Sequence, residues 1–161
     1  MIRLFLLVGV LAIGSGCKDP AEFTNWVKKT GELREKADPL IDLIPYSREQ
    51  QEAFRDYFTE LEKVALRLKN DKKFTVSFNE LFKKTTGASR AGVADLKTIC
   101  ETILMPKERW LRLVSGCTKN GFFLCSEEVA HYPEFVSALR DSLVEVQRKK
   151  FDSTAVCSVF H

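Results

Sequence analysis

Five cysteines and two histidines are the side chains of this sequence best suited to covalent or metal chemistry. They are Cys17, Cys100, Cys117, Cys125 and Cys157, with His131 and His161. Structural zinc sites usually take two cysteines that lie two to four residues apart. The closest two cysteines here, Cys117 and Cys125, are eight positions apart. The sequence therefore predicts no metal site and no cofactor, and it favours disulfide bonds.

The four cysteines after residue 99 form an even set, as two disulfides in an oxidising compartment require. Four cysteines allow three pairings, and spacing alone does not choose among them. Our hypothesis is that Cys117 pairs with Cys125 across the loop at Gly121. Cys100 would then pair with Cys157 and fasten the C-terminal tail to a helix of the body.

No set of residues predicts catalysis. A nucleophile needs a base within hydrogen-bond reach. His131, which stands before Tyr132-Pro133, is typical of a surface or capping residue in a turn, and His161 ends the chain. Glu127 and Glu128 suit the start of a helix, where negative charge is favoured. Phosphate-binding glycine loops, G-x-S-x-G and H-E-x-x-H are absent from the sequence. We therefore expect a protein without catalytic residues, and an enzyme would have to use Glu127, Glu128 or His131.

The first sixteen residues have the layout of a secretory signal. Arg3 supplies a positive start, Leu4 to Gly14 is an apolar run of eleven residues, and Ser15-Gly16 are small. A membrane-spanning helix needs about 20 apolar residues, and the charges of Lys18-Asp19 follow at once. Residues 1-16 are therefore expected to be a cleaved signal segment, and residues 17-161 the mature protein.

The segment Ile13-Gly14-Ser15-Gly16-Cys17 resembles the lipobox of bacterial lipoproteins, although Gly14 stands where that family prefers Leu, Val or Ala. The resemblance implies cleavage before Cys17 and attachment of fatty acyl chains such as palmitate to it. The cysteine count agrees independently, because an acylated Cys17 leaves an even number of cysteines. Lys18 after the cysteine implies, by resemblance, the outer rather than the inner membrane. The expected location is the bacterial cell envelope, facing the periplasm or the cell surface.

The balance of charge bears on the partners of the mature protein. Removing Arg3 leaves 24 basic against 22 acidic residues, which is too even to indicate nucleic acid. We expect a lipid-anchored, non-enzymatic protein that binds another protein or an envelope component. The alternative is an inhibitor or immunity-type protein that blocks an exported enzyme. Its inserted element would be the loop of Asn120, Gly121, Phe122 and Phe123, although burial of those rings in the core is the interpretation we favour.

The composition predicts one ordered domain. Apolar residues make up 45% of the chain and charged residues 29%, as in globular proteins. Apolar residues recur at helical spacing in several segments, so the expected fold is an all-α, single-domain bundle of about four to six helices. The clearest helices are residues 20-37, after Asp19-Pro20, and residues 48-70, after Ser47. A turn of helix is expected from Asp38-Pro39. Further helices are expected around Ser77-Phe82, from Ser89 or Arg90 to Met105-Pro106, and from Pro133 to about Lys150.

Residues 107 to 126 allow two interpretations. Trp110, Leu113 and Val114 suit one face of a helix that leads into an ordered, disulfide-bearing loop, which is the interpretation we favour. Asn120-Gly121 is also a strong hairpin signal, and it would make the flanking segments Trp110 to Cys117 and Phe122 to Cys125 strands. In both cases a disulfide-bearing loop or short hairpin is expected near residues 115-126.

Overall fold

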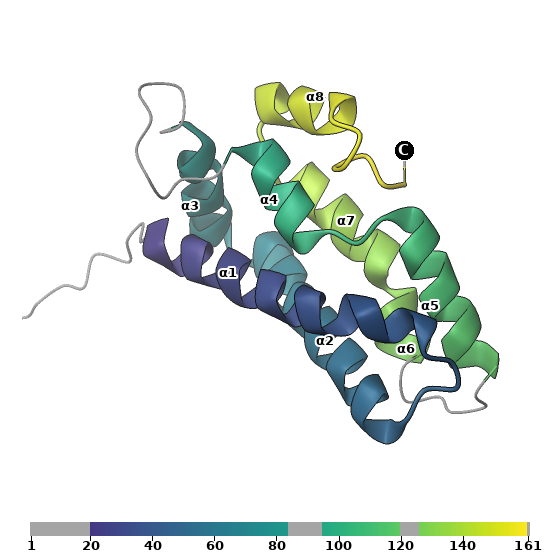
Figure 1. The fold of residues 1–161 in the computed structure, drawn as a ribbon. Coiled ribbons are helices and arrows are strands. Elements are labelled where there is room, and N and C mark those ends of the chain that lie inside the picture. Colours follow the sequence, from purple (N-terminus) through teal and green to yellow (C-terminus); the bar gives the residue numbers. More distant parts are fainter. Residues whose placement is uncertain (1–19, 84–94, 120–125, 161) are drawn as a thin grey trace, which may run out of the picture.

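A computed structural model of the chain describes residues 20–83, 95–119 and 126–160. Those residues form an all-α bundle, which confirms the predicted fold class, and the described ranges contain no strand (Figure 1). The helices are α1 (Pro20–Ala37), the 3-10 helix η1 (Asp38–Asp42), α2 (Arg48–Asn70), α3 (Lys72–Lys83), α4 (Leu96–Ile103), α5 (Lys107–Lys119), α6 (Ser126–Ala130), α7 (Tyr132–Asp141) and α8 (Glu145–Ser153). No helix in these ranges is both long enough and apolar enough to cross a membrane.

Helix α2 is the centre of the bundle. It starts at a capping box in which the Ser47 hydroxyl accepts from the Gln50 amide and the Gln50 side chain accepts from the Ser47 amide. Its apolar stripe is buried as predicted, and consists of Phe54, Tyr57, Phe58, Leu61, Val64, Ala65 and Leu68. Helices α1, α3, α6 and α7 all pack against α2, so its register positions most of the surface described below.

Two helices begin at residues other than those predicted. Helix α3 begins at Lys72 and not at Ser77, because Asp71 accepts a hydrogen bond from the Phe74 amide. Helix α4 begins at Leu96 and not near Ser89, because Asp95 caps it through the Thr98 amide. At the start of α3 an aspartate therefore outcompetes the serine that the sequence favoured. Residues 84–94 lie outside the described ranges.

The predicted final helix is also wrong in its length. The chain breaks at Ser142 to Val144 and restarts as α8. Buried Asn79 of α3 holds this break, since its amide donates to the Ser142 carbonyl and its carbonyl accepts from the Val144 amide. Val146 of α8 is 75% exposed as a result.

The segment from residue 107 is helical. Helix α5 runs to Lys119 with Leu113 fully buried, and Trp110 donates its indole N–H to the Val129 carbonyl. The hairpin alternative is therefore wrong for Trp110 to Cys117. Residues 120–125, which include the expected loop, lie outside the described residues.

Candidate functional site

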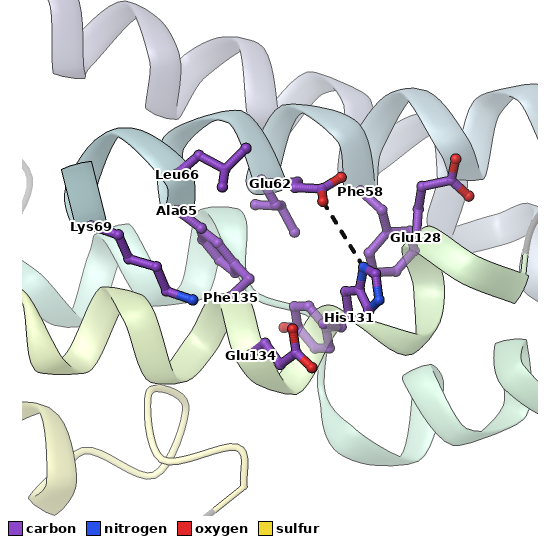
Figure 2. Close-up of a pocket in the computed structure, with 11 residues that line it drawn as sticks. Phe58, Glu62, Ala65, Leu66, Lys69, Glu128, His131, Glu134 and Phe135 are labelled. Carbon is purple, nitrogen blue, oxygen red and sulfur yellow. Dashed lines mark ion pairs between the residues drawn. The ribbon is translucent and has the colours of Figure 1, made fainter. Parts of the chain in front are cut away.

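A groove between α2 on one side and α6 and α7 on the other is a concave site with convergent charges. Its volume is about 80 Å³. Figure 2 shows side chains of both walls meeting over it. The apolar lining comes from Phe58, Leu61, Ala65, Leu66, Tyr132 and Phe135, and the charged or titratable lining from Glu62, Lys69, Glu128, His131 and Glu134. We call this site the acidic groove.

The α2 wall follows from helical geometry. Phe58, Glu62, Ala65 and Lys69 recur every three or four residues, so they lie on one flank of the helix. Leu66 stands at the rim and is 53% exposed. An exposed apolar side chain at the edge of a concave site is available to a partner.

The opposite wall is fixed by the junction of α6 and α7. His131 joins these helices with an α-region backbone, and Pro133 lies in the first turn of α7. The Phe135 amide donates to the His131 carbonyl, so the chain hardly departs from a helix. Glu128, His131 and Glu134 are each three residues apart and therefore face the same side.

Tyr132 anchors the floor of the groove. Its ring is 1% exposed and packs edge-on against Phe58, with the ring centres 5.6 Å apart. Its hydroxyl donates to the Met105 carbonyl at 2.8 Å and accepts from the Met105 amide. Burial raises the pKa of Tyr132 far above its ordinary value, so the phenol stays protonated. This hydroxyl is committed to the fold, and only the ring contributes to the groove.

The rim is predominantly negative. Glu62, Glu128 and Glu134 supply three carboxylates against the single ammonium group of Lys69, which leaves two negative charges when the imidazole is neutral. The closest charged contact joins His131 Nδ1 and Glu62 Oε1 at 3.9 Å, and both side chains are 46% exposed. Figure 2 marks this contact with a dashed line.

The chemistry that this lining supports is binding. Apart from the Tyr132 phenol, the groove's lining includes neither a hydroxyl nor a thiol for His131 to activate. In the described part of the chain, no three His, Cys, Asp or Glu side chains are arranged to hold a metal ion. The groove instead combines an apolar floor with charges at its edge, which is the usual composition of a binding site.

The structure brings together only some of the predicted site residues. His131 and Glu128 line the groove, whereas Glu127 is exposed outside it. His131 is a surface residue, as expected, but its side chain makes no capping hydrogen bond. The charged residues of the groove that the sequence did not reveal are Glu62, Lys69 and Glu134. In the sequence, each of these residues is only a polar position on an amphipathic helix, which is typical of any solvated helix face.

The disulfide hypothesis is confirmed for one pair. Cys100 of α4 and Cys157 of the C-terminal tail form a disulfide, with their Cα atoms 5.2 Å apart and both residues fully buried. Cys117 is also disulfide-bonded. Its predicted partner Cys125 lies outside the described residues, as do Cys17, His161 and the predicted interaction loop of Asn120, Gly121, Phe122 and Phe123.

Comparisons of the chain with protein-family models, with characterised proteins and with solved structures found no match.

Proposed function

We propose that this protein is a lipid-anchored protein of the bacterial cell envelope that binds a partner protein without catalysing a reaction. The signal-like leader, the lipobox-like segment ending at Cys17 and the odd number of cysteines support the anchor. The disulfide between Cys100 and Cys157 supports an oxidising compartment. Lys18 favours the outer membrane within that envelope.

The acidic groove is the reason for proposing that the protein binds a partner. The single observation behind it is an apolar floor rimmed by the carboxylates of Glu62, Glu128 and Glu134. A volume of about 80 Å³ suits one side chain better than a drug-sized ligand, which takes at least about 300 Å³. The partner we propose is a protein segment that inserts an apolar side chain into the groove and carries a lysine or arginine beside it.

Charge-matched peptides test this binding mode. The purified protein is titrated with two fluorescent peptides that share a central leucine, one flanked by lysines and the other by glutamates, and binding is followed by anisotropy. The lysine peptide should bind at least tenfold more tightly. Raising the salt concentration should weaken its binding, because salt screens exposed charges beyond about 10 Å at 0.1 M. Equal binding of both peptides would contradict the proposal.

The short helix α6 offers a matched pair of variants. Glu128→Lys reverses a charge in the groove, and Glu127→Lys makes the same change one residue away, at an exposed position outside the lining. The first variant should lose most of the affinity for the lysine peptide, and the second should keep it. Equal losses would show that only the overall charge of the surface matters.

Detergent phase partitioning tests whether the protein carries a lipid anchor on Cys17. The native protein should partition into the detergent phase, and the Cys17→Ser variant should move to the aqueous phase. Native protein found in the aqueous phase would refute the lipid anchor while leaving the groove untouched.

A further inference from the structure

The imidazole of His131 gives the acidic groove a side chain that can gain a proton near neutral pH. Of the side-chain types in the lining, only an imidazole ordinarily changes charge between about pH 8 and 5. Its position is fixed by the backbone, because Pro133 lies in the next turn and the Phe135 amide donates to the His131 carbonyl. A proton on His131 therefore changes the charge of the groove while the other lining residues keep theirs.

Carboxylates from three helices surround this imidazole. Glu62 of α2 lies 3.9 Å from it, measured from Oε1 to Nδ1. Glu128 of α6 and Glu134 of α7 stand three residues to either side of His131 on the opposite wall. The cation of the lining, Lys69, is seven residues and about two turns beyond Glu62 on α2. Figure 2 shows Lys69 and His131 at opposite ends of the groove. Helices α5 and α8 also pack against α6 and α7, but they contribute no residue to the lining.

The contact between His131 and Glu62 depends on that proton. At 3.9 Å it is too long for a hydrogen bond, and it becomes an ion pair only when the imidazole is charged. Within the described ranges Glu62 makes no other ion pair. A neutral imidazole leaves two negative charges in the groove, whereas a protonated one leaves a single negative charge and engages Glu62 from across the groove. A lysine of a partner then meets both a weaker attraction and a competing cation.

We infer that a proton on His131 and the cation of the partner bind to the acidic groove in competition, so that the partner is held near neutral pH and released in mildly acidic surroundings. This inference rests on the partner binding proposed above. The coupling is reciprocal: if the proton weakens the binding of the partner, the bound partner weakens the binding of the proton by the same factor.

Coulomb's law sets the expected size of this coupling. Both side chains are 46% exposed, and the dielectric constant of bulk water, about 80, gives the smallest estimate for such groups. Two unit charges about 4 to 6 Å apart in water change a binding constant about three- to sixfold. Salt screens exposed charges, so the coupling is measured at low ionic strength.

The lysine and glutamate peptides described above measure the coupling directly. Both are acetylated and amidated, and their dye must have an emission that does not change with pH in this range. The native protein should bind the lysine peptide at least threefold more weakly at about pH 5.5 than at about pH 7.5. The glutamate peptide should not lose affinity, because its charge has the opposite sign.

The two histidines of the sequence provide a matched pair of variants. Each variant is compared with itself at the two pH values. His131→Gln should remove the pH dependence, and His161→Gln should keep it. In NMR spectra of the native protein, the lysine peptide should move the titration of the His131 imidazole to lower pH and leave that of His161 in place.

The outcomes separate this inference from the proposed function. Equal affinity of the lysine peptide at both pH values, a pH dependence that survives in His131→Gln, or parallel weakening of both peptides overturns the inference and leaves the proposed binding in place. A lysine peptide that binds no more tightly than the glutamate peptide at about pH 7.5 overturns the proposed binding and this inference together.

Discussion

The disulfide between Cys100 and Cys157 should supply a large part of the protein's stability, which would therefore be lost in a reducing compartment. It joins α4 to the last residues of the chain across 57 positions, and both cysteines are fully buried. Replacing both with alanine removes the bond without leaving an unpaired thiol or a buried hydroxyl. The double variant should therefore fold to the same structure with a reduced free energy of unfolding.

The loop length sets the size of the effect. On the chain-entropy model, a cross-link that closes a loop of this length stabilises the folded state by about 4 kcal/mol at 25 °C. For a domain of about this size, each kcal/mol shifts the melting temperature by about 3 °C. The double variant should therefore melt about 12 °C below the native protein.

Thermal unfolding followed by circular dichroism at 222 nm measures this difference. The native protein and the double variant are compared under oxidising conditions and again with a reductant. The variant keeps only the disulfide of Cys117. Any change in its melting temperature when the reductant is added therefore measures the contribution of that second bond. Equal melting temperatures for the native protein and the variant under oxidising conditions would refute the argument that this bond constrains the unfolded chain.

Three further substitutions test contacts that position the helices. Gly116→Ala would place a Cβ atom 2.4 Å from the Tyr46 hydroxyl, which donates to the Ile41 carbonyl, so it should destabilise the protein by about 1–3 kcal/mol in urea unfolding. Asn79→Ala leaves the Val144 amide without its acceptor, and should cost about 1–3 kcal/mol and raise hydrogen exchange at residues 142–144. Asp95→Ala should cost about 1 kcal/mol at neutral pH. Because the Thr98 amide lowers the pKa of Asp95 in the folded state, this cost should shrink as the pH falls below about 4, and a constant cost would refute the cap.

The helices that the sequence predicted best are those with both a cap and a continuous apolar stripe. Helix α2 has the Ser47 capping box and buries its whole predicted stripe. The predictions were wrong where two capping residues compete within a few positions, as with Asp71 and Ser77. They were also wrong at the end of α7, where a side chain distant in sequence decides the outcome. Asn79 is more than sixty positions from Val144, and no local pattern reveals such a contact.

The acidic groove was beyond sequence reasoning for a similar reason. Glu62 and Lys69 lie on α2, and His131 and Glu134 lie about seventy positions later, so only the packing of α2 against α7 brings them together. Each of these residues by itself is typical of a solvated helix face. His131 was the one groove residue with a distinctive environment in the sequence, and its position before Pro133 indicated a turn and not a partner.

Helix α2 relates the two grooves to each other. On α2, the acidic groove is lined by Phe58, Leu61, Glu62, Ala65, Leu66 and Lys69, and a second groove, between α1, α2 and the start of α3, is lined by Glu60, Lys63, Val64 and Arg67. At about 100° per residue, the two sets centre about 180° apart around the helix axis. The two grooves therefore open on opposite sides of α2. The partner segment proposed for the acidic groove would therefore contact the face of α2 opposite the second groove, and α2, uninterrupted over 23 residues, keeps that geometry fixed.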